Sequence, residues 1–149
     1  MTRTLLFLCL VASALAAPAP DANAQQPVTS LRGSWSATIG TRPALQGTWS
    51  AELQEKTPNA ASGTWTLVGA GGTVVARGTW SATKTSGTWS GAWAARAAGG
   101  GSRSGTWRAD AGGGAKTFAD LLRSSLETQL TGAWRSGGLQ GRWALKAAS

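Results

Sequence analysis

The sequence predicts an all-β protein: an eight-stranded antiparallel meander that closes into a barrel or folds into a sandwich, with one short α-helix between strands six and seven. Three observations favour this fold. Every one of the nine tryptophans has a glycine two residues before it. Ser and Thr flank most of the tryptophans. Glycine-rich or polar stretches separate the motifs, and a motif repeated over a whole chain indicates repeated structure.

The Gly-x-Trp repeat has the period of a β-strand. A spacing of two residues puts glycine and tryptophan on one face of a strand and the intervening Ser or Thr on the other. This alternation is typical of half-buried antiparallel strands. The motifs are Gly33/Trp35, Gly47/Trp49, Gly63/Trp65, Gly78/Trp80, Gly87/Trp89, Gly91/Trp93, Gly105/Trp107, Gly132/Trp134 and Gly141/Trp143.

The repeat also predicts how neighbouring strands pair. If each tryptophan lies opposite the glycine of the next strand, the indole covers bare backbone, and this register fixes the centre of each turn. The predicted centres are Thr41, Lys56, Gly71-Gly72, Thr83-Lys84, Gly99 and Gly137-Gly138. Two of them are Gly-Gly pairs, which suit tight hairpins. Thr83-Lys84, from pairing Trp80 with the Trp89 motif, is a poorer turn.

The repeat and its turns predict the strand boundaries. The expected strands are Arg32–Ile39, Ala44–Leu53, Ser62–Val68, Val74–Thr83, Ser86–Arg96, Ser102–Ala109, Gln129–Ser136 and Leu139–Ala147. Closure of these strands into a barrel would remove exposed sheet edges, and burial of the indoles would supply a core.

One segment between the sixth and seventh strands has a helical period. Thr117 and Asp120 resemble a capping box at its start. The apolar residues on one helical face are Phe118, Leu121, Leu122 and Leu126. A helix this short is not stable alone, so its apolar face is expected to pack on the sheet or to close one end of a barrel.

Residues 1–24 resemble a cleaved secretory signal peptide. A short basic start at Arg3 precedes the apolar run Leu5–Ala17, which is too short to span a bilayer comfortably. The triplet Ala22-Asn23-Ala24 suits cleavage after Ala24, with Ala16 or Ala17 as the competing site. Residues 25–149 then form a single extracytoplasmic domain, periplasmic or secreted.

The composition argues against disulfides and against most catalytic chemistry. Cys9, the only cysteine, lies in the signal segment, and the chain has no histidine or tyrosine. These absences remove the common general base, thiol nucleophile and metal ligands. Five carboxylates remain in residues 25–149, and of these Glu52 and Glu55 are best interpreted as a solvated hairpin tip, with Asp120 and Glu127 as helix residues and Asp110 as the fifth. We therefore expect a non-enzymatic protein without metal or cofactor.

The tryptophans are interpreted mainly as a core ladder, with one candidate ligand-binding region. Trp93 follows Trp89 by four residues on the same face, so that one strand carries two tryptophans. Trp93 is therefore the candidate for a residue at a pocket mouth, with Arg96 and Trp89 beside it. Indoles with Ser and Arg nearby suit stacking on sugar rings, nucleobases or an apolar ligand.

The segment Gly33-Ser34-Trp35 resembles the Gly-x-Trp motif of the first strand of lipocalins and avidins, which are exported eight-stranded barrels. The resemblance covers this one short segment, and it implies an architecture only. In this chain the motif recurs along the whole sequence.

These observations predict a binding or interaction module of the cell envelope or outside the cell. Its partner would be a small ligand or an envelope component. The formal net charge is +8, but the basic residues are dispersed and give no specific nucleic-acid signal. Two alternatives stay open: an outer-membrane barrel with its apolar face toward lipid, and a self-assembling sheet protein.

Overall fold

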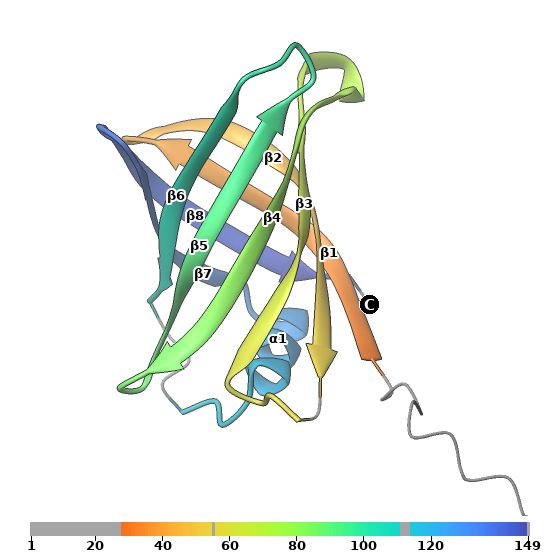
Figure 1. Ribbon diagram of the computed structural model, residues 1–149, viewed down its shortest axis with the longest axis vertical. Helices are drawn as coiled ribbons and strands as arrows, with labels where there is room; N and C mark the ends of the chain where they lie inside the picture. Colours follow the sequence, from red (N-terminus) through yellow and green to blue (C-terminus); the bar gives the residue numbers. More distant parts are fainter. Residues whose placement is uncertain (1–27, 55, 111–113, 149) are drawn as a thin grey trace, which may run out of the picture.

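The computed structural model describes residues 28–54, 56–110 and 114–148, which form a closed barrel of eight antiparallel strands (Figure 1). The predicted fold class is confirmed, and of its two forms the barrel is the one observed. The signal segment and Glu55 lie outside the described residues. The strands are β1 (Val28–Ile39), β2 (Arg42–Gln54), β3 (Ala60–Val68), β4 (Val74–Thr85), β5 (Thr88–Ala97), β6 (Ser102–Ala109), β7 (Leu130–Ser136) and β8 (Leu139–Ala147).

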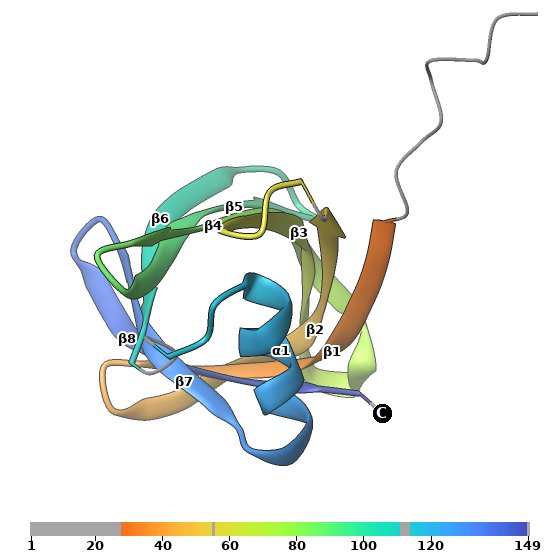
Figure 2. The same ribbon diagram turned by 90° about the horizontal axis from the view of Figure 1, so that it is seen from below.

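The barrel has two different ends. The turns that follow β1, β3, β5 and β7 lie at one end, here called the hairpin end (Figure 1). The helix α1 (Phe118–Glu127), between β6 and β7 as predicted, lies across the opposite end, here called the helix end (Figure 2). No helix in the described part of the chain is long and apolar enough to cross a membrane.

Within each of the four hairpins, the predicted register is confirmed. The tryptophan of each strand lies opposite the glycine of the other strand. Each hairpin therefore has two Trp–Gly pairs, in which an indole covers backbone that carries no side chain. The pairs are Trp35 with Gly47, Trp49 with Gly33, Trp65 with Gly78, Trp80 with Gly63, Trp93 with Gly105, Trp107 with Gly91, Trp134 with Gly141 and Trp143 with Gly132.

Between hairpins, the predicted register is wrong. Trp49 pairs with Trp65 and Trp80 with Trp93, so tryptophan faces tryptophan at these junctions. The physical reason is that a closed barrel needs its strands staggered and tilted. Within each hairpin, tryptophan lies directly opposite glycine. The offset between strands therefore occurs where one hairpin pairs with the next.

The turn predicted at Thr83-Lys84 is also wrong. The β4–β5 turn is formed by Ser86 and Gly87, both with positive φ, 49° and 77°. Two consecutive positive φ values suit a tight hairpin turn, which glycine adopts readily. Gly87 is therefore a turn residue, unlike the other eight motif glycines, and β4 continues to Thr85.

The motif glycines are required because three strands approach closely around each of them. A Cβ built on Gly47 of β2 would lie 1.7 Å from the Thr66 carbonyl oxygen of β3 and 2.9 Å from Nε1 of Trp35. At the other seven paired glycines, a Cβ would lie 1.7–2.1 Å from a backbone carbonyl oxygen. No side chain fits at these positions without movement of the backbone.

The bare backbone lets an indole reach the strand beyond its partner. Trp35 of β1 lies over Gly47 of β2, and its Nε1 donates to the Thr66 carbonyl of β3 at 3.0 Å. The seam between β8 and β1 is bridged in the same way. Trp49 donates to the Lys146 carbonyl at 3.2 Å, and Trp134 donates to the Thr38 carbonyl at 2.9 Å. Trp80 and Trp107 reach a third strand in the same way, whereas Trp65 and Trp143 donate to the partner strand of their own hairpin.

The two faces of the sheet differ as the alternation predicts. The indoles face the barrel interior, and Ser, Thr and Arg of the same strands face outward. Across β2 and β3, for example, the hydroxyls of Thr48 and Thr66 lie 2.7 Å apart, and those of Ser50 and Thr64 lie 2.9 Å apart. The dry face of the sheet is therefore the inner one.

We predict that Gly47→Ala lowers the free energy of unfolding by about 2–3 kcal/mol, because overpacking forces side chains and backbone to shift. Chemical denaturation followed by tryptophan fluorescence measures the change. Gly138→Ala is the control, since a Cβ there meets nothing within 4 Å. Equal stability of the two variants would contradict the close approach of the three strands.

Candidate ligand-binding site

The barrel encloses an apolar cavity of about 350 Å³. Its wall contains all eight indoles of the Trp–Gly pairs: Trp35, Trp49, Trp65, Trp80, Trp93, Trp107, Trp134 and Trp143. Six of these are only half-buried although they face inward, because the cavity leaves part of each ring uncovered. Trp49 and Trp134 are more fully covered, at 4% and 9% exposure.

The wall is ordered by contacts between indoles. The indoles of the odd-numbered strands form a continuous edge-to-face series: Trp35 with Trp65 at 5.6 Å between ring centroids, Trp65 with Trp93 at 6.2 Å, and Trp93 with Trp134 at 6.2 Å. Trp107 and Trp143 of the even-numbered strands make a similar contact at 5.8 Å. Edge-to-face pairs and hydrogen-bonded N–H groups together hold the rings in fixed orientations.

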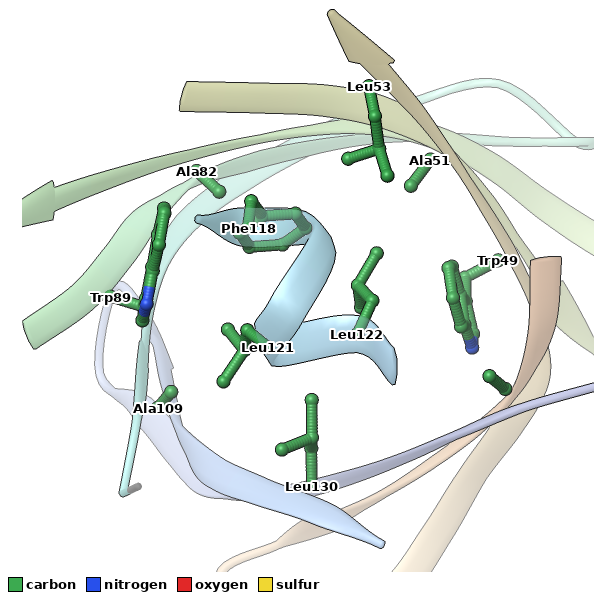
Figure 3. Packing of buried hydrophobic residues seen from close by; sticks show 11 residues of the cluster. Trp49, Ala51, Leu53, Ala82, Trp89, Ala109, Phe118, Leu121, Leu122 and Leu130 are labelled. Atoms are coloured by element: carbon green, nitrogen blue, oxygen red, sulfur yellow. The ribbon is translucent and has the colours of Figure 1, made fainter. Parts of the chain in front are cut away.

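The floor of the cavity is the helix α1. Its buried face presents Phe118, Leu121 and Leu122 to the barrel interior (Figure 3). Phe118 packs on Trp89 at 5.0 Å and on Trp80 at 5.5 Å between ring centroids. The helix therefore closes one end of the barrel, which is one of the two placements that the sequence predicted.

One residue of the predicted apolar helix face differs. Leu126 is 43% exposed, and Ser125 is the buried residue of that turn. The Ser125 hydroxyl donates to the Leu122 carbonyl within the helix, which satisfies its polar group. With its hydroxyl satisfied inside the helix, the small Ser125 side chain can occupy this buried position.

The mouth lies at the hairpin end. Ile39 and Leu139 reach it and are 39% and 38% exposed. Arg103 of β6 also lines it, as the one charged side chain among the described lining residues. Arg103 is two residues before Gly105 and pairs with Ala95 of β5, another lining residue, so its position in the strand directs it inward.

The three predicted site residues do not come together. Trp93 lies in the cavity wall, in contact with Trp65 and Trp134. Arg96 is exposed and, one position from Ala95, lies on the outer face of the barrel. Trp89 is fully buried at the helix end, against Phe118 (Figure 3).

The tryptophan that departs from the repeat is Trp89, and the interpretation of Trp93 as the exception is wrong. Trp93 has the regular partner Gly105, whereas Trp89 lies opposite Lys84, whose Nζ is 5.8 Å from its ring centroid. The Nε1 of Trp89 is buried and has no hydrogen-bond partner among the described residues. Gly87 precedes Trp89 by two residues, as a paired glycine would, so the motif alone does not distinguish Trp89 from Trp93.

Arg103 is the lining residue that sequence reasoning missed. The signal was present: Arg103, Gly105 and Trp107 alternate along one strand, so they share a face. The carboxylates of the described residues do not form a site. Glu52 is exposed on the outer face, and Asp110 pairs with Arg142 and accepts a hydrogen bond from Thr131 at 2.9 Å.

Comparisons with known proteins give no relative. No protein-family model matches the chain, and neither a curated protein nor a solved structure is significantly similar to it. Within the described ranges, no group of three His, Cys, Asp or Glu side chains is placed to hold a metal ion.

The start of α1 carries a capping box, as predicted. The Asp120 backbone N–H donates to Thr117 Oγ1 at 3.1 Å, and the Thr117 N–H donates to the Asp120 carboxylate at 3.1 Å. The hydrogen bonds from the side chain and then the backbone of Thr117 hold the pKa of Asp120 below its ordinary value of 3.8. A lowered pKa in the folded state means that the charged carboxylate stabilises the fold above the ordinary pKa, and that this stabilisation is lost on acidification.

We predict that Asp120→Asn lowers Tm at neutral pH and that the difference from wild type shrinks as the pH falls below 3.8. Thermal unfolding followed by circular dichroism over this pH range measures it. Glu127→Gln is the control, because a carboxylate at the C-terminal end of the helix opposes the helix dipole and its removal costs nothing. A pH-independent loss for Asp120→Asn would contradict the assigned role of its charge.

Proposed function

We propose that this protein is an extracytoplasmic binding module that holds a small apolar ligand inside its barrel without catalysing a reaction. The observation that carries the proposal is the apolar cavity of about 350 Å³ walled by indoles. Its volume lies at the lower end of the roughly 300–1,000 Å³ range of small-molecule sites. Its lining is apolar or aromatic apart from Arg103, the general character of such sites.

The rigidity of the wall supports binding over simple core packing. Indoles held by edge-to-face contacts and by hydrogen bonds to backbone carbonyls do not collapse onto one another. A pre-formed cavity of this kind binds with little ordering of side chains, which would otherwise oppose association. Removal of ligand apolar surface from water supplies the driving force.

The lack of catalysis is supported by the chemistry of the lining. Arg103 is its one ionisable group, and arginine does not act as a general base because it stays protonated. The described carboxylates lie outside the cavity lining. Export is supported by the signal-like pattern of residues 1–24 alone.

Two observations disfavour the alternatives. An outer-membrane barrel needs an apolar outer belt, but Ser, Thr and Arg occupy the outer face of the described strands, with Thr48 and Thr66 among them. A self-assembling sheet needs free edges, and the pairing of β1 with β8 leaves none among the eight strands. We therefore propose the binding module alone.

We predict that the purified protein binds a neutral apolar fluorophore, N-phenyl-1-naphthylamine, and that Ala95→Phe weakens this binding about tenfold or more by filling the cavity. Titration followed by probe fluorescence and by quenching of the indoles measures the dissociation constant. Ala94→Phe is the matched control, because Ala94 is exposed on the outer face of the same strand.

The pair of variants separates cavity binding from surface adsorption. Unchanged binding by Ala94→Phe and weakened binding by Ala95→Phe support the proposed site. Equal binding by both variants, or no binding by the wild type, would overturn it. Far-ultraviolet circular dichroism of each variant checks that the barrel has formed.

A further inference from the structure

We propose that the ligand is an amphipathic carboxylate whose apolar body lies against the indoles and whose charged head binds Arg103 at the mouth. This inference rests on the proposed function and names the chemical class of its ligand. It follows from three features: the lining position of Arg103, the lack of an acidic partner for it among the described residues, and the distribution of charge over the barrel.

Arg103 is placed where the head group of a bound amphiphile would lie. It belongs to the inward-facing series of β6, with Gly105 and Trp107 following it toward the helix end. Its strand neighbour across the mouth is Ala95, which is too small to cover it. A ligand with its apolar end on the helix floor and its polar end at the mouth would therefore meet the guanidinium group.

Among the described residues, the Arg103 side chain forms no ion pair and no hydrogen bond. The ion pairs formed there are Arg123 with Asp120 and Arg142 with Asp110, and neither includes Arg103. Ser136, also near the mouth, donates its hydroxyl to the Ser104 carbonyl at 2.7 Å. The guanidinium thus remains the hydrogen-bond donor available to a ligand, and its planar fork matches a carboxylate.

Acidic and basic residues are distributed differently along the barrel: basic residues lie toward both ends, with Lys84 and Arg108 near the helix end, whereas the described carboxylates lie toward one end only. The described carboxylates are near the helix end: Glu52 near the end of β2, Asp110 just after β6, and Asp120 and Glu127 on α1. Toward the hairpin end, Arg77 and Arg96 lie directly opposite each other on β4 and β5. Like charges in cross-strand pairs are unfavourable, so this pair contributes a positive field near Arg103 at a cost in stability.

The test compares two ligands that share one alkyl chain, decanoate and 1-decanol, at neutral pH and low ionic strength. We expect wild-type protein to bind decanoate about tenfold more tightly than decanol, because a charge-assisted hydrogen bond adds to the same apolar contact. Arg103→Gln is expected to remove this preference, so that decanoate and decanol bind with similar affinity. Displacement of N-phenyl-1-naphthylamine measures both affinities. Arg135→Gln, which removes one positive charge from the outer face of β7, is the matched control and keeps the preference.

The outcomes separate this inference from the proposed function. Loss of the preference in Arg103→Gln but not in Arg135→Gln supports the carboxylate assignment. Equal affinity of wild type for decanoate and decanol overturns it and leaves an apolar cavity without head-group recognition. The same loss in both arginine variants also overturns it, because the effect then comes from net charge. Binding of neither ligand overturns the proposed cavity function itself.

Discussion

The contact of an indole with a bare glycine is the interaction on which the rest of this structure depends. Gly47 has no side chain, so Trp35 can lie flat across β2 and donate its Nε1–H to the Thr66 carbonyl of β3. The Trp–Gly contact repeats around the barrel, and in five cases the indole N–H also reaches a third strand: Trp35, Trp49, Trp80, Trp107 and Trp134. In the described part of the chain there is no cysteine, and these contacts link the sheet laterally where disulfides would otherwise do so.

The same contact explains why the interior keeps a cavity. Edge-to-face contacts restrict the rotation of the indoles toward the barrel axis, and the series from Trp35 to Trp134 follows the wall around that axis. Compact packing is confined to the helix end, where Phe118 and Leu122 meet Trp89 and Trp49 (Figure 3). The cavity lies between α1 and the hairpin end of the barrel.

Much of the fold could be predicted from the sequence because the repeat fixes local register. Trp65 and Gly78 are joined by a short turn, so the placement of one determines the other, and the same holds in each hairpin. The register between hairpins could not be predicted, since the stagger of a closed barrel is a property of all eight strands together. The roles of Trp93 and Trp89 depend on that stagger, so the sequence alone could not distinguish them.

The cavity could not be predicted either, because a sequence shows which face of a strand is apolar but not how much of the space behind that face is filled. Arg103 could have been predicted as a lining residue, since it alternates with Gly105 on the inward face of its strand.

The central claim is that five of the indoles are hydrogen-bonded across glycine to a third strand, and hydrogen exchange of their indole N–H groups tests it most directly. In nitrogen-15 spectra of the labelled protein, the Nε1 protons of Trp35, Trp49 and Trp134 are predicted to exchange as slowly as the backbone amides at the centre of β1 and β2, because both open only when the barrel unfolds. Exchange of these indole protons at the rate of free tryptophan, in a protein whose backbone amides remain protected, would contradict the account.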